Sequence, residues 1–361
     1  MEEETIKPLP DPARCDAFWA REDVDRPLLS CWVGSFTIAG HYPHGTASLP
    51  NAELEPDDIV FEQFRPDYES LFVSHAAIGA DVPWAAFPLM TMPWVEAIIG
   101  CPIYHRDGNI WAAPWLDTYE ALEKIELKAD NPWFVRLLEL TDWLVELSAG
   151  RFPVSMSLMR GPLDLLSALR GPQRMCLDLF DHPEELDEAL QRLTNIWIDI
   201  ARAQLARIPA FEGGYSSGMI NLWSREPMAW FQDDALALWS PKYYRRHLRS
   251  CEEQLSRCMG VTGIHLHPVS LFVIKDLMAM PELDVIEVNC DDEGPTMSDM
   301  IPYLKRTLKE KNLVIWGAFT MADLRVIKEH LPSRGLALQV MAETPDEVRI
   351  TVDRLRRMWH D

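Results

Sequence analysis

The stretch from residue 262 to residue 292, TGIHLHPVSLFVIKDLMAMPELDVIEVNCDD, constrains the fold more than any other part of the chain. Two apolar, β-branched segments flank a segment whose apolar residues recur at helical spacing. This pattern predicts a strand, a helix and a second strand. Two strands joined through a crossover helix run parallel to each other. The stretch therefore predicts a parallel α/β sheet, in which functional residues gather at the carboxyl ends of the strands.

Polar side chains stand where these two predicted strands end. The first strand ends in His265 and His267, and the second carries Glu287 and continues into Cys290 and Asp291. Side chains two residues apart point to the same face of a strand, so the two histidines share a face. Because neighbouring strands lie about 4.8 Å apart, we expect the polar groups of both strands to meet at one point.

About eight strand–helix alternations follow one another from residue 27 onwards, with no low-complexity linker between them. A (β/α)8 barrel needs roughly 250 residues, and more with insertions. We therefore predict a single (β/α)8 TIM barrel over residues 27–361, in preference to a doubly wound sheet, with a helical N-terminal extension over residues 1–26. Residues 35–60 lack periodicity and follow the first strand, so we expect this loop to fold over the carboxyl ends of the strands.

The charge and the cysteines exclude several classes of protein. A net charge of −22 offers no basic stripe to nucleic acid and opposes binding to an anionic membrane. The seven cysteines are scattered without a CxxC pair, and the acidic, proline-rich start is unlike a signal peptide, so we expect a cytoplasmic protein. No apolar run reaches the roughly 18 residues of a membrane helix. The oligomeric state stays open, with a homodimer as one option.

Three segments together resemble the uroporphyrinogen decarboxylase superfamily. They are GPLDLLSALRGPQRMCLDLFDHPEELDEALQRLT (161–194), DDALALWSPKYYRRHLRSCEEQL (233–255) and ETPDEVRITVDRL (343–355). The strand IHLHP, residues 264–268, falls where the superfamily has an HxCG or HSxG sequence. The resemblance covers roughly residues 60–358, rests on the order and spacing of these motifs, and implies a TIM barrel.

The superfamily contains uroporphyrinogen decarboxylases and zinc methyltransferases that move methyl groups between corrinoid proteins and thiols. The methyltransferase branch implies a zinc ion, a corrinoid protein as partner and a small thiol as substrate. This chain departs from that branch in having His265-x-His267 in place of His-x-Cys, and Met341-Ala342-Glu343 in place of a later cysteine. The RQAGR-type carboxylate clamp of the decarboxylases has no arginine counterpart in the segment LSCWVGSFTIAGHYP.

The histidines are the first candidates for metal ligands, because neutral imidazole suits zinc and two histidines on one strand can bind one ion. His265 and His267 would then be joined by Cys290 as a soft third ligand from the next strand. Glu287 is a candidate as a further ligand or as a group that orients a histidine. The alternatives are a polar site without metal, histidines with purely structural hydrogen bonds, and a cysteine that is simply buried.

Three further residues are candidates for catalysis. Asp234, paired with Asp233 ahead of a helix, could hold a proton or a substrate ammonium group, or could cap that helix. Arg160 ends an apolar strand and could bind a substrate carboxylate, or pair with Asp164. Tyr215 follows two glycines at a predicted strand end and could reach the site, or pack at its rim.

Three functions stay open at this point. The first is a methyltransferase that moves a methyl group between a corrinoid protein and a small thiol or similar acceptor. In this function the metal lowers the pKa of the thiol and makes it a nucleophile. The second is a metal-free decarboxylase of a small carboxylate or tetrapyrrole-like substrate, in which Asp234 stabilises a protonated intermediate and Arg160 binds a carboxylate. The third is a ligand-binding barrel without catalysis. The sequence has no dinucleotide-type glycine loop, GxSxG elbow or HExxH motif, so hydride transfer and serine hydrolysis have no support.

Overall fold

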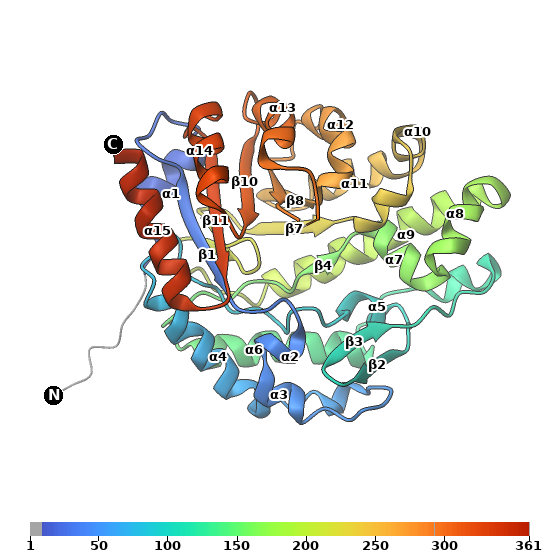
Figure 1. Ribbon diagram of the computed structural model, residues 1–361. Helices are drawn as coiled ribbons and strands as arrows, with labels where there is room; N and C mark the ends of the chain where they lie inside the picture. The colour runs from blue at the N-terminus through green and yellow to red at the C-terminus, as the bar shows by residue number, and fades with distance from the viewer. Residues whose placement is uncertain (1–8, 292, 361) are drawn as a thin grey trace.

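The computed structural model describes residues 9–291 and 293–360. In this part of the chain the main sheet has seven strands, all paired in parallel, in the order β1-β11-β10-β9-β8-β7-β4 (Figure 1). The strands are β1 (Leu28–Val33), β4 (Met159–Arg160), β7 (Met228–Gln232), β8 (Val261–Leu266), β9 (Val285–Asn289), β10 (Asn312–Gly317) and β11 (Leu336–Ala342). The predicted parallel α/β sheet is therefore confirmed.

Helices lie along the outside of this sheet. The last helix contacts both β1 and β11, which lie side by side in Figure 1. The α-helices are α1 (Pro12–Trp19), α2 (Ile38–His41), α3 (Pro43–Ala47), α4 (Phe61–Ala76), α5 (Trp94–Ile98), α6 (Pro132–Ser148), α7 (Pro162–Arg170), α8 (Pro172–Asp181), α9 (Pro183–Leu205), α10 (Pro241–Tyr243), α11 (Arg249–Leu255), α12 (Ile274–Met278), α13 (Met297–Thr307), α14 (Met321–His330) and α15 (Pro345–His360). Among the described residues, no helix combines the length and the apolar character needed to cross a membrane.

The longest helix shows why these segments pack as they do. In α9 the side chains of Leu186, Leu190, Leu193 and Trp197 are buried, and their spacing of three or four residues puts them on one helical face. Asp187, Glu188, Gln191 and Asn195, which lie between them, are exposed. The amphipathic pattern that predicts this helix is thus also the pattern that attaches it to the protein core.

The stretch around the two histidines forms the predicted βαβ unit. β8 leads through the 3-10 helix η5 (Pro268–Val273) and α12 into β9, and the two strands pair in parallel with His265 opposite Glu287. The helical segment, predicted as one helix, is split into a 3-10 turn and a short α-helix. The turn starts at Pro268, whose fixed φ suits the first position of a helix.

Two segments adjoin the two edges of the sheet and pair with other segments only in part. Ala86 forms an isolated parallel bridge with Val154, a few residues before β4. On the other edge, the Asp81 N–H donates to the Leu29 carbonyl of β1 at 2.9 Å. Pro153 has no N–H to donate, which helps to explain why the ladder beside β4 is short.

The remaining strands form two antiparallel hairpins outside the main sheet. They are β2 (Ile103–Arg106) with β3 (Asn109–Ala112), and β5 (Tyr215–Ser217) with β6 (Leu222–Ser224). The segment 35–60, expected to be an irregular loop, instead contains α2, α3 and the 3-10 turn η1 (Pro56–Asp58). Of the expected N-terminal extension, α1 is present, and residues 1–8 lie outside the described residues.

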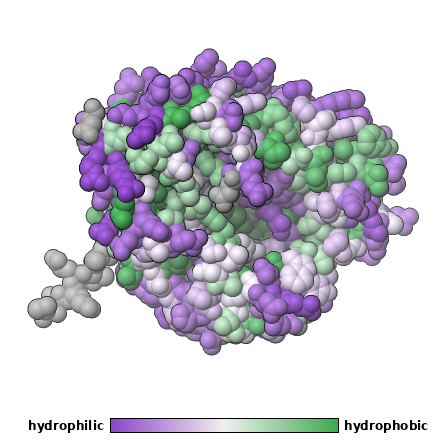
Figure 2. Space-filling model, viewed as in Figure 1, coloured by the Kyte–Doolittle hydropathy of each residue, from purple (hydrophilic) through white to green (hydrophobic). Residues whose placement is uncertain are grey.

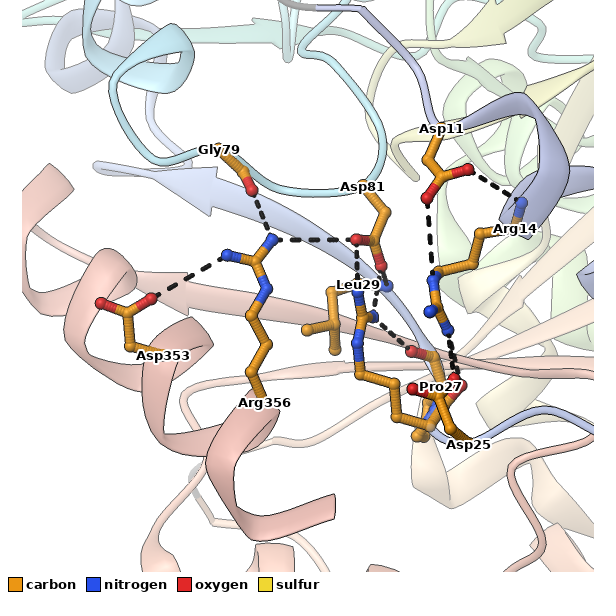
Figure 3. A network of polar contacts seen from close by, with 10 residues as sticks. Asp11, Arg14, Asp25, Pro27, Leu29, Gly79, Asp81, Asp353 and Arg356 are labelled. Carbon is orange, nitrogen blue, oxygen red and sulfur yellow. Dashed lines mark hydrogen bonds and ion pairs between the residues drawn. The ribbon is translucent and has the colours of Figure 1, made fainter. Parts of the chain in front are cut away.

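A buried ion-pair network joins the first strand to the last helix (Figure 3). The Asp81 carboxylate lies 2.5 and 2.7 Å from the guanidinium of Arg26, and it also accepts the Leu29 N–H at 2.8 Å. Arg356 of α15 reaches the same carboxylate at 3.7 Å and bonds to the Gly79 carbonyl. These contacts hold the segment before the Ala86 bridge against β1 and α15.

Candidate metal centre

His265 is held by a carboxylate from the neighbouring strand. Its Nδ1 bonds to the Glu287 carboxylate, and both side chains are buried. Burial acts to lower the pKa of His265, but the charge and hydrogen bond of Glu287 outweigh it, so this pKa is raised. Burial raises the pKa of Glu287 as well, and the neighbouring imidazole of His265 offsets this rise only in part. The contact fixes the ring and leaves Nε2 for a ligand.

His267 follows the end of β8 and is held by Asp291 in the same way. Its Nδ1 lies 2.8 and 3.0 Å from the two Asp291 oxygens, and Asn289 donates to one of them at 2.7 Å. The rings of His265 and His267 meet edge to face, with centroids 4.9 Å apart. The two imidazoles therefore stand together, each with a carboxylate on Nδ1.

Asp234 supplies a third ligand group from the end of β7, on the other side of β8. It starts the 3-10 helix η3 (Asp234–Leu238), and one of its oxygens lies 3.8 Å from His267 Nε2. Its other oxygen accepts from Gln232 at 2.8 Å. One donor atom from each of Asp234, His265 and His267 lies within 4.8 Å of the other two.

This set of donors fits a divalent metal ion. Two neutral imidazoles and a carboxylate are ligands that zinc and other first-row metals accept, and catalytic sites leave further positions open. Carboxylates such as Glu287 and Asp291, bonded to the far nitrogen of each imidazole, are the usual outer partners of metal-binding histidines. The donors suit more than one such metal, so they do not by themselves assign zinc.

A reciprocal pair of carboxylates fixes the loop that carries Asp234. Asp233 accepts the N–H groups of Leu163 and Asp164 at the start of α7, at 2.7 and 3.2 Å. Asp164 in turn accepts those of Asp234 and Ala235, at 3.0 and 2.7 Å. Burial raises the pKa of both carboxyls, that of Asp164 to about 7. Asp233 thus caps the start of α7, an earlier helix than the following one for which the aspartate pair was considered, and Asp234 is left to face the histidines.

Both histidines line a hollow of about 420 Å³. Figure 2 shows the molecule hollowed near the centre of the view, with hydrophilic and hydrophobic residues side by side. The polar residues that line the hollow include His265, His267, Asn289, Cys290 and Asp291, and the apolar ones include Phe36, Met90, Met219, Trp316 and Met341. Phe36 belongs to the segment 35–60, so the start of that segment lies at the carboxyl ends of the strands.

A larger hollow of about 760 Å³ adjoins the first. The two share three lining residues, Thr91, Leu158 and Gln232. Arg160 lines the larger one with a side chain that is 41% exposed, and its guanidinium lies 2.5 Å from the buried Glu96 carboxylate. The charge of Glu96 raises the pKa of Arg160. Arg160 thus has Glu96 as its ion-pair partner, and the exposed part of the guanidinium can meet a substrate.

Two of the candidate ligands lie beside the three-residue group without belonging to it. Glu287 sits behind His265, where it matches the orienting role and not the role of a ligand. Cys290 lines the smaller hollow next to Gly317, and burial raises the pKa of its thiol to about 12, so the thiol stays protonated.

Tyr215, expected at a strand end from which it could reach the site, lies away from this group in a hairpin outside the main sheet. It pairs with Ser224 in the β5–β6 hairpin. Ser224 lines a separate hollow with Val261 and Asn312, the first residues of β8 and β10, at the opposite end of the strands. The glycine signal marked a tight turn ahead of β5, closed by the Phe211–Gly214 bridge, in which Gly213 has a φ of +76°.

Several site residues were not assigned from the sequence. Asp291 was placed among the polar residues at the strand ends, but it was given no role of its own at the site. Phe36 and Trp316 face the hollow from the ends of β1 and β10, and aromatic residues at such ends were the available signal. Glu96 comes from α5 and no local pattern marks it.

Comparison with known proteins gives a likeness of fold. The sequence matches no protein-family profile and no curated protein sequence. The structure resembles that of a methyltransferase from Methanosarcina mazei with a TM-score of 0.65 and 16% sequence identity, over 97% of this chain and 99% of that one. At this identity the likeness establishes a shared fold alone, and sequence does not confirm the superfamily suggested by the motifs.

Proposed function

We propose that this chain is a metal-dependent methyltransferase that moves a methyl group to or from a small thiol or similar acceptor. The observation that carries the proposal is the convergence of Asp234, His265 and His267, with a carboxylate behind each imidazole. The fold shared with a methyltransferase supports the reaction class. A bound metal ion would supply Lewis-acid chemistry that lowers the pKa of a thiol.

The residues around the ligand group have separate tasks in this proposal. Glu287 and Asp291 orient the imidazoles and keep Nδ1 occupied, so that Nε2 of each ring is left for a metal ion. The Met and aromatic side of the hollow excludes water from the acceptor. Arg160, in the adjoining hollow, is placed to bind a carboxylate carried by the substrate.

We also propose that the sheet closes into a (β/α)8 barrel that spans residues 27–361. The segments around Ala86 and Val154 would complete the ring between β1 and β4. The Ala86–Val154 bridge and the bond from the Asp81 N–H to the Leu29 carbonyl support this closure. The resemblance of the motifs makes a corrinoid protein the first candidate for the methyl-carrying partner, docked at the carboxyl ends of the strands.

Metal analysis of the purified protein tests the proposal. We expect near-stoichiometric metal after zinc or iron supplementation, and its loss in the double variant His265→Ala/His267→Ala, because both imidazole donors are gone. The matched control is His330→Ala/His360→Ala, which removes two exposed histidines and should keep the metal. Protein that stays metal-free after supplementation with either ion contradicts the proposal.

A metal-free decarboxylase remains a second candidate, because Arg160 stands exposed in a hollow large enough for a carboxylate substrate. In that reading Arg160 binds the carboxylate and Asp234 stabilises the protonated intermediate. Release of carbon dioxide by metal-free protein, lost in Arg160→Met, would favour this candidate over methyl transfer.

A further inference from the structure

We propose that the smaller hollow binds a small methylated cation, a quaternary ammonium or tertiary sulfonium compound, and that this cation is a methyl donor for the thiol. The inference rests on the proposed function for its methyl acceptor, whereas binding of the cation stands on the hollow itself. A small donor of this kind would supply the methyl group without a corrinoid protein. Three properties of the hollow support it: an aromatic corner, an excess of negative charge and a soft lining.

The aromatic corner is formed by Phe36 and Trp316. Their ring centroids are 4.9 Å apart and their planes are inclined at 73°, so the rings stand as two adjoining walls. Trp32 stacks on Phe36 at 5.3 Å, with planes 11° apart, and His41 stacks on Trp32 in turn at 4.8 Å. This stack fixes the Phe36 ring. Rings set at such angles attract the methyl groups around a positively charged nitrogen or sulfur through cation–π interaction.

The charge around the hollow is negative. Among its described lining residues there is no lysine or arginine, and Asp291 faces it with a side chain that is 33% exposed. Glu287 lies directly behind His265, and one of its oxygens has no hydrogen-bond partner among the described residues. With a divalent metal ion bound, the negative charges of Glu287, Asp291 and Asp234, which lines the adjoining hollow, would still exceed the positive charge of the ion. The net charge of −22 adds a long-range attraction for cations.

The rest of the lining is soft and apolar. Met90, Met219 and Met341 line the hollow, and thioether side chains are polarizable and adapt to the shape of a ligand. A trimethylammonium or dimethylsulfonium group presents apolar methyl groups around a diffuse charge. It can therefore fill a pocket of this kind, which strongly hydrated cations such as a lysine ammonium would enter at a larger desolvation cost.

The transfer itself balances. The sulfur of a thiolate attacks a methyl carbon of the cation and forms a new carbon–sulfur bond with its electron pair. The bond from that methyl to the nitrogen or sulfonium sulfur breaks, and its electron pair stays on the leaving atom. The products are a methyl thioether and a neutral tertiary amine or thioether. Opposite charges disappear in this step, so a hollow that excludes water favours it.

Calorimetric titration with choline, in the absence of any thiol, tests the binding. The matched ligand is the neutral carbon analogue in which a tert-butyl group replaces the trimethylammonium group. We expect choline to bind about tenfold or more tightly than this analogue, because only the cation gains from the rings and carboxylates. Phe36→Leu should remove most of that difference, whereas Phe36→Tyr should keep it.

The control is Phe180→Leu, which removes an exposed ring of α8 outside the hollow and should leave choline binding unchanged. Equal affinity for choline and its neutral analogue overturns the inference, and so does a lack of choline binding by folded wild-type protein. Either result leaves the metal analysis untouched. Wild-type protein that binds choline but stays metal-free would instead contradict the proposed function and leave the cation site standing.

Discussion

Glu287 allows the orientation of a histidine to be tested by a change of one functional group. Glu287→Gln keeps the size of the buried side chain but removes its charge and weakens the bond to His265 Nδ1. We expect metal affinity to fall by about 10- to 100-fold, as for other outer partners of metal-binding histidines. Competition with a chromophoric chelator measures this affinity. The exposed Glu329→Gln is the control, and equal affinities in all three proteins would show that packing alone orients His265.

Individual residues also show what the sequence could and could not predict. His265 and Glu287 could be placed side by side, because a βαβ unit brings two strands into parallel pairing and alternation fixes their faces. The contact between Arg160 and Glu96 could not, since α5 and β4 are distant in sequence and share no periodic pattern. Tyr215 was misplaced because a β-strand pattern does not reveal its pairing partner.

The connection between β1, the segment before Ala86 and α15 depends on one carboxylate. Asp81→Asn leaves the buried Arg26 guanidinium without its charged partner, so we expect a loss of about 3–5 kcal/mol in the free energy of unfolding. Urea denaturation measures the loss. Asp346→Asn, which breaks an exposed pair with Arg349, should change stability by less than about 1 kcal/mol. Similar effects of both substitutions would refute a special role for Asp81.

At the level of elements, the regular part of the fold was open to prediction and the irregular part was not. The strands from β7 to β11 are apolar and regularly paired, so their pattern is strong. The segments around Ala86 and Val154 contain prolines and pair with each other only through an isolated bridge. The segment 35–60 lacks periodicity because α2 and α3 are too short to show any.

The stability of the whole molecule should depend on pH through Glu252. This carboxyl is fully buried, accepts from the Tyr244 hydroxyl at 2.6 Å, and has a pKa raised by burial to about 8. Its pKa in the folded state lies above its ordinary value of 4.5, so the fold keeps a proton that the unfolded chain loses. Stability from this group is therefore present at low pH and is lost as pH rises towards 8.

Glu252→Gln removes this titration and keeps a group that can accept from Tyr244. We expect the variant to be more stable than wild type at about pH 8, by on the order of 1–3 kcal/mol, and similar to it at about pH 5. Thermal unfolding at the two pH values measures the difference. If the stability of wild type and variant changed with pH in parallel, groups other than Glu252 would set the pH dependence.

The network around Asp81 also bears on the order in which a nascent chain can finish folding. The Asp81 carbonyl accepts the Asp11 N–H at 2.8 Å, while its carboxylate meets Arg356, so both ends of the described chain converge on one residue. β1 likewise finds its ladder partner in β11, which is synthesised long after it. The first strand must therefore wait, unpaired on that side, until β11 has left the ribosome. Ribosome stalling before residue 336 should leave it open to chaperones and proteases.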